Sequence, residues 1–96
     1  MIGRFLSAAE KEFADAGIFY ETERAGLGDE FFKTIQAAIH RLEQIPEIGR
    51  PINSHYRSVL VLRFPFRIIY RILDSEIVIV AVAHQRRRPN YWRERM

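Results

Sequence analysis

The sequence predicts one α+β domain over residues 1–96, in which a helical hairpin packs on one face of a curved antiparallel sheet. The expected order is β-α-α-β-β-β, followed by a short C-terminal tail. Two observations predict this fold class. Apolar residues recur at helical spacing in the first half of the chain and alternate with polar residues in much of the second half. A loop-like segment rich in proline, glycine, asparagine and serine, residues 46–56, separates the two halves.

A short apolar run, residues 2–6 (IGRFL), predicts a strand before the first helix. Ser7 and Glu10 have the spacing of a capping box, so we expect the helix to begin there. Its apolar stripe consists of Ala9, Phe13, Ala16 and Tyr20. Ile18 and Phe19 fall outside that stripe, so they either stay exposed for a partner or pack against the second helix.

Two glycines in residues 25–28 (AGLG) interrupt the helical pattern and predict the turn of a hairpin. A second apolar stripe predicts a helix that ends at Pro46; it consists of Phe31, Phe32, Ile35, Ala38, Ile39, Leu42 and Ile45. Three β-rich runs follow the loop: residues 57–64 (RSVLVLRF), 66–73 (FRIIYRIL) and 76–84 (EIVIVAVAH). Their short connections predict an antiparallel meander. The third run is apolar on both faces and belongs near the sheet centre.

Charge is divided unevenly between the two halves of the chain. Residues 1–49 carry five Lys/Arg and nine Asp/Glu, whereas residues 50–96 carry ten Arg and three Asp/Glu. A guanidinium stays charged and fits phosphate or carboxylate oxygens with its fork of donors, whereas a lysine can lose its proton and act as a base. The second half of the chain is therefore better suited to binding anions than to moving protons.

Seven arginines fall on or beside the predicted meander: Arg57, Arg63, Arg67, Arg71, Arg86, Arg87 and Arg88. If the strands pair as neighbours, these guanidiniums converge on one face, bordered by Tyr91 and Trp92, and attract phosphates or an acidic peptide. The alternative is a solvated face whose arginine stems cover apolar residues. His84 ends the third run and is a candidate general acid or base, although a lone histidine at a strand end is more often structural.

Other chemistries find no support in the sequence. There is no cysteine, no metal-ligand spacing of histidines and carboxylates, no Gly-rich phosphate loop and no nucleophile elbow, so we expect neither a metal nor a cofactor. The N-terminal residues do not have the pattern of a signal peptide or of a spanning helix. We therefore expect a cytoplasmic protein without a membrane partner, in keeping with the lack of cysteine.

Three parts of the chain carry a resemblance: residues 63–72 (RFPFRIIYRI), residues 81–92 (AVAHQRRRPNYW), and residues 26–32 (GLGDEFF) followed by P-x-x-G-R-P at 46–51. In order and spacing they resemble the ParE/RelE superfamily of toxins from type II toxin–antitoxin modules, and within it the ParE-like plasmid-stabilisation branch. This resemblance implies a growth-inhibiting toxin that a cognate antitoxin holds inactive in a hetero-oligomer. It also implies that a flexible antitoxin segment folds along the toxin on binding.

Members of this superfamily divide by target. RelE-type members cleave messenger RNA in the ribosome, whereas ParE-type members inhibit DNA gyrase by binding. The resemblance places Arg67 and Arg87 where RelE-type nucleases stabilise the phosphate, and Tyr91 close to their C-terminal tyrosine. The lysines that those nucleases carry on the first strand of the meander have no counterpart in residues 57–63. His84 is the candidate to substitute as a base, and a ribonuclease would use Arg67 and Arg87 together with His84 or Tyr91. The resemblance thus favours a gyrase inhibitor, with the endoribonuclease as the alternative and a module that binds only its antitoxin as a third possibility.

Overall fold

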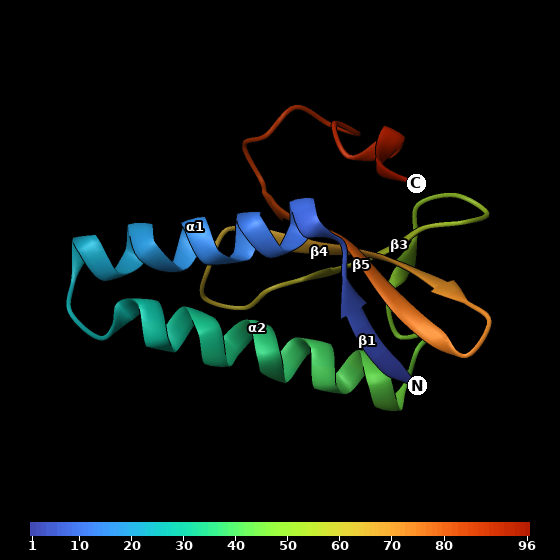
Figure 1. Cartoon of the computed structure of the whole chain (residues 1–96), viewed down its shortest axis with the longest axis horizontal. Coiled ribbons are helices and arrows are strands. Elements are labelled where there is room, and N and C mark those ends of the chain that lie inside the picture. Colours follow the sequence, from blue (N-terminus) through green and yellow to red (C-terminus); the bar gives the residue numbers. More distant parts are fainter.

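The computed structural model describes all residues, Met1–Met96, and confirms the expected fold class: a helical hairpin lies on one face of a sheet (Figure 1). The strands are β1 (Ile2–Phe5), β2 (Arg50–Pro51), β3 (Arg57–Leu60), β4 (Phe66–Leu73) and β5 (Glu76–His84). The helices are α1 (Ser7–Glu23), α2 (Leu27–Gln44) and a final 3-10 turn, η1 (Arg93–Arg95). Neither long helix combines the length and apolar character needed to cross a membrane.

The sheet has five strands in the order β1-β5-β4-β3-β2. The predicted meander is confirmed, because β3, β4 and β5 pair as antiparallel neighbours. The sheet as a whole is mixed, since β1 runs parallel to β5. No hairpin turn joins β1 to its neighbour, so nothing local fixes an antiparallel direction. The two-residue strand β2, which the sequence did not predict, lies in the expected loop and contains Pro51, a residue that sheets tolerate at their edges.

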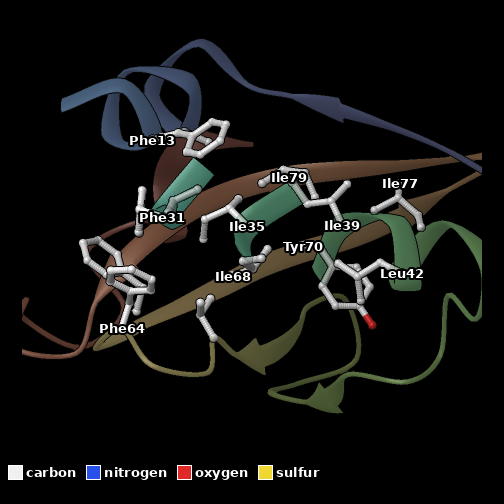
Figure 2. Close-up of a cluster of buried hydrophobic side chains, with 14 residues drawn as sticks. Phe13, Phe31, Ile35, Ile39, Leu42, Phe64, Ile68, Tyr70, Ile77 and Ile79 are labelled. Atoms are coloured by element: carbon white, nitrogen blue, oxygen red, sulfur yellow. The ribbon is translucent and has the colours of Figure 1, made fainter. Parts of the chain in front are cut away.

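The main core lies between the helical hairpin and the sheet (Figure 2). Phe31 is fully buried, and its ring centroid lies 5.2 Å from that of Phe64 and 5.1 Å from that of Phe66. Ile35 and Leu42 continue the buried stripe of α2 toward Tyr70. The periodicity of the second helix therefore predicted most of its buried face, but Phe32 and Ile45, which belong to the predicted stripe, are 40% and 57% exposed.

A second core lies on the opposite face of the sheet. Here Val78 and Val80 of β5 are covered by Tyr56 and by Trp92 of the C-terminal tail. The ring centroids of Tyr56 and Trp92 are 4.9 Å apart, and Trp92 is only 4% exposed. Trp92 does border the basic surface, where it lies beside Arg67 and Arg87, but its indole is buried against this apolar face, because burial there gains more than exposure to water. The C-terminal tail thus covers the second apolar face of β5, which explains why this strand is apolar on both faces.

A β-bulge in β5 changes which residues face each core. Ile69 pairs with Ala81 but Tyr70 pairs with Ile79, so Val80 is an extra residue on β5. Simple alternation would place Val80 and Val82 on the same face, whereas the bulge turns Val82 into the main core. No pattern in the sequence predicts this change, because every residue around it is apolar.

The start of α1 also differs from the predicted capping box. Leu6 is the N-cap residue, and no side chain caps the helix. The backbone N–H of Leu6 donates to the carbonyl oxygen of Ile79 at 3.0 Å, which continues the pairing of β1 with β5. The sheet therefore fixes where the helix begins, and the hydroxyl of Ser7 is not needed for it.

Candidate functional site

The side chains of Glu12 and Arg95 complete the sheet where β1 ends. β1 pairs with β5 only as far as Ile79. Beyond it, the Val82 N–H donates to Glu12 Oε1 at 3.0 Å, and Arg95 Nη1 donates to the Val80 carbonyl oxygen at 2.9 Å. The same guanidinium donates to both oxygens of Glu12 at 2.9 Å. This largely buried ion pair satisfies exposed backbone groups and fastens the tail to α1.

Tyr91 is held by the same carboxylate. Its hydroxyl donates to Glu12 Oε2 at 2.5 Å, and the guanidinium of Arg87 lies over its ring, 3.9 Å from the centroid. Burial, followed by the bond to Glu12, raises the pKa of Tyr91 well above its ordinary value. The phenol therefore stays protonated at neutral pH, with its proton directed at Glu12 and away from any substrate.

The ring of His84 also interacts with groups of the protein itself. Its Nδ1 accepts a hydrogen bond from the backbone N–H of Arg86 at 3.0 Å, so a neutral His84 carries its proton on Nε2. The ring meets that of Phe66 edge-on, with 5.1 Å between centroids. In this arrangement His84 offers no unprotonated ring nitrogen that could accept a substrate proton.

Three of the predicted arginines line one hollow of about 310 Å³ on the sheet face opposite the helices, which we call the arginine pocket. Its charged walls are Arg67, Arg87 and Arg88, and none of its lining residues is acidic. Arg67 is anchored by a 3.0 Å hydrogen bond from Nη1 to the hydroxyl of the buried Ser58. Such a set of guanidiniums can hold an anion but is poorly suited to removing a proton.

The other predicted arginines do not join this pocket, so the expected convergence of seven guanidiniums is wrong. Arg57 donates to the carbonyl oxygens of Glu47 and Gly49 on the other face, at 3.2 and 2.9 Å. Arg63 lies in the loop between β3 and β4 with a positive φ of 74°, and it pairs with Glu30 of α2 at 3.0 Å. The guanidinium of Arg71 lies 5.7 Å from the centroid of the Tyr56 ring. Arg86 is exposed and its side chain has no partner.

A groove lined by apolar and charged residues runs between α2 and the outer edge of β3, and we call it the α2/β3 groove. It consists of two hollows of about 420 and 430 Å³ that share Ala38, Arg41 and Leu60. β2 pairs only with Arg57 and Ser58, so the edge of the sheet is open beyond them. Leu60 and Leu62 are 57% and 74% exposed beside this open edge. Arg67 lines this groove as well as the arginine pocket.

Ile18 and Phe19 lie near the end of α1 and are 66% and 57% exposed. Neither side chain belongs to the core of the hairpin, so both are exposed rather than packed against the second helix. As for metals, the structure contains no group of three or more histidine, aspartate or glutamate side chains placed to hold an ion.

The residues that the sequence did not single out are Glu12 and Arg95. Glu12 is one of five acidic residues on α1, and the other four are exposed. Its position three residues after Ala9 and one before Phe13 places it at the border of the apolar stripe, and that spacing was the available signal. Nothing in the sequence indicated that the partner of Glu12 would come from the end of the chain.

The fold is that of the small α+β toxins of the ParE/RelE type. A family model described as "ParE toxin of type II toxin-antitoxin system, parDE" matches residues 4–89, and this chain belongs to that family. It is 27% identical over 88 residues to Toxin ParE2 of Mycobacterium tuberculosis, strains CDC 1551 and H37Rv, which covers 91% of this chain and 84% of that toxin. A solved structure of the chromosomal ParDE system from P. aeruginosa has the same fold, with a TM-score of 0.65 and 17% identity, over 88% of this chain and 95% of that one.

Proposed function

We propose that this toxin acts by binding and inhibiting DNA gyrase and that it does not cleave RNA. Membership of the ParE family supports the target. The observation that carries the absence of nuclease chemistry is the state of the two candidate bases: the Tyr91 hydroxyl donates to Glu12, and His84 Nδ1 accepts from a backbone N–H. A general base must be able to receive the proton of the attacking hydroxyl, and neither side chain is arranged to do so.

One observation favours the endoribonuclease alternative: Arg67 and Arg87 line the same pocket. Arginines at a phosphate stabilise developing negative charge, but they do not activate a nucleophile at neutral pH. The pocket thus supplies the phosphate-binding half of such a reaction without the proton-accepting half. We therefore rank ribonuclease activity second.

A supercoiling assay tests the proposal. Purified toxin added to gyrase, relaxed plasmid and ATP is expected to stop supercoiling in a dose-dependent manner, and prior addition of the cognate antitoxin to restore it. A translating extract with the same toxin is expected to keep its messenger intact. Full gyrase activity at saturating toxin would contradict the proposal. Messenger cleavage that is lost in the double variant Arg67→Ala, Arg87→Ala would establish the alternative.

We further propose that the α2/β3 groove receives the antitoxin. About half of its lining residues are apolar, Arg41 and Arg50 line it as well, and the edge of β3 beyond Ser58 has backbone groups available for an added strand. An extended or amphipathic segment with acidic residues fits these three features together, because apolar contacts, charge and main-chain hydrogen bonds would each find a partner. The alternative surface is the one formed by Ile18 and Phe19.

The two surfaces are distinguished by matched double variants. Leu60→Asp with Leu62→Asp is expected to weaken antitoxin binding by about 100-fold, because it places charge on the apolar wall of the groove. Ile18→Asp with Phe19→Asp changes the same number of exposed apolar residues and is expected to leave the affinity within about threefold. Calorimetric titration of each toxin variant with the antitoxin measures both. A large loss of affinity in the Ile18→Asp, Phe19→Asp variant alone would indicate that the antitoxin binds at α1 instead.

A further inference from the structure

We infer that the outer side of α1 binds the same side of a second copy of this chain, with the two helices antiparallel. Six exposed residues of α1 form this surface, which we call the α1 face: Ser7, Ala8, Lys11, Asp15, Ile18 and Phe19. None of the six lines the arginine pocket or the α2/β3 groove, so the inference goes beyond the proposed function. Three features carry it: apolar side chains that the fold leaves uncovered, a pair of opposite charges, and a matching order of small and large residues.

The fold leaves the α1 face uncovered. The buried residues of α1 are Ala9, Phe13 and Gly17, on the side where the helix packs beside α2 and the sheet (Figure 1). Because a turn of helix contains 3.6 residues, the α1 face lies on the opposite side. Neither core includes Ile18 or Phe19, and both residues are more than half exposed. Complete burial of side chains of this kind contributes about 1.5–3 kcal/mol each, so a partner that covers them is stabilised.

The charges of the α1 face favour an antiparallel pair. Lys11 Nζ lies 2.7 Å from Asp15 Oδ2, and both side chains are mostly exposed. In an antiparallel pair centred on position 13, Lys11 of each copy is level with Asp15 of the other, so two further ion pairs form about a twofold axis. A parallel pair would place Lys11 beside Lys11. Sliding one antiparallel helix by about one turn, in either direction, brings Asp15 level with Asp15 or Lys11 level with Lys11, so the charges also fix the register.

The sizes of the other residues select the same register. Centring the pair on position 13 places the small Ser7 and Ala8 level with the large Phe19 and Ile18 of the second copy. A small residue opposite a large one lets two helices approach to about 8–10 Å between their axes, the usual distance for packed helices. The apolar side chains of each copy are then covered by the other copy. Charge and size therefore favour one arrangement independently.

The size of the α1 face predicts a weak dimer. From Ser7 to Phe19 the helix is about 18 Å long, and a helix with its side chains is about 10 Å wide. A contact strip of these dimensions is smaller than the roughly 800 Å² that each partner contributes to a stable interface of standard size. We therefore expect the copies to associate with a dissociation constant of about 100 μM and to separate on dilution.

Sedimentation equilibrium of the full chain, from about 10 μM to about 1 mM, tests the inference. The mean mass of the wild-type chain is expected to rise with concentration toward twice that of one chain. Lys11→Asp and Asp15→Lys are each expected to weaken association by at least about tenfold. Twofold symmetry explains the size of this effect, because one substitution replaces two attractive contacts by two repulsive ones.

An equimolar mixture of these two variants is the decisive sample. One chain then carries two acidic residues on its α1 face and the other carries two basic ones, so the mixture is expected to associate at least as tightly as the wild-type chain. Added salt should weaken this association. Lys33→Asp and Asp29→Lys are the matched controls, because they alter an exposed ion pair of the same spacing on α2, 3.0 Å between Nζ and Oδ2. Each control should leave association within about twofold of the wild-type value.

Three outcomes would overturn the inference: a wild-type chain that keeps the mass of one copy at the highest concentration, a mixture no heavier than its separate variants, and equal losses in the α2 controls. If the wild-type chain stays a single copy and Ile18→Asp with Phe19→Asp abolishes inhibition of gyrase or binding of the antitoxin, the α1 face belongs to that partner instead. Circular dichroism of each variant checks that the fold is kept. Because the sedimentation samples contain neither gyrase nor antitoxin, this inference and the proposed function can each fail alone.

Discussion

Replacing Glu12 by glutamine is expected to lower the free energy of unfolding by about 3 kcal/mol and to release the C-terminal tail from the sheet. Glu12 is largely buried and bonds the guanidinium of Arg95, the hydroxyl of Tyr91 and the backbone N–H of Val82. The neutral amide removes the charge that pairs with Arg95 while leaving that guanidinium partly buried. Its NH₂ group would also face the donors that the carboxylate had accepted.

Trp92 makes this effect directly observable, because it is the only tryptophan and lies in the tail. Urea denaturation followed by its fluorescence gives the stability, and a red-shifted emission before unfolding reports the released tail. Glu23→Gln is the matched control: Glu23 is exposed at the end of the same helix and has no side-chain partner. A Glu12→Gln chain as stable as this control would contradict the role given to the carboxylate.

Alanine at Gly49 is expected to lower the free energy of unfolding by about 2–3 kcal/mol. A β-carbon at this position would clash with the hydroxyl of Tyr70 and lie 2.6 Å from its Cε1 and 2.9 Å from its Cζ. Tyr70 cannot move aside, because its side chain is fully buried and its hydroxyl both donates and accepts a hydrogen bond. That hydroxyl accepts from the Gly49 N–H at 2.8 Å and donates to the Pro46 carbonyl oxygen at 2.7 Å.

Gly17→Ala is the contrasting variant, and thermal denaturation of both compares them. Gly17 lies inside α1, and its added β-carbon would meet Phe32 at 3.4 Å, an ordinary contact. Alanine should therefore stabilise this helix by about 0.5–1 kcal/mol. The opposite signs separate a steric requirement for glycine from a general effect of the substitution. A Gly49→Ala chain that unfolds at the wild-type temperature would show that the loop before β2 can yield.

The hairpin and the meander could be predicted because each depends on a pattern within one segment. The stripe from Phe31 to Leu42 and the alternation in residues 66–73 both reflect which face of one element is buried. The direction of β1 and the bulge at Val80 could not be predicted in this way. Each is decided by pairing between strands that are distant in the sequence or equally apolar on both faces.

The candidate site was predicted in part, and the errors have a common origin. A count of arginines does not show on which face of a strand each lies, so Arg57 and Arg63 were grouped with residues from which the fold separates them. Nor does it show which polar groups they will find nearby. Trp92 borders the arginine pocket, but nothing in its basic, proline-containing segment indicates that its indole also covers an apolar face.

The double position of Arg67 has a thermodynamic consequence. One side chain borders both the arginine pocket and the α2/β3 groove, so we expect a ligand that engages it from one side to alter what the other side can bind. If a partner in the groove lowers the affinity of the pocket by some factor, an anion in the pocket must lower the affinity of that partner by the same factor. The shared guanidinium of Arg67 would in this way couple the affinities of two binding surfaces on a small protein.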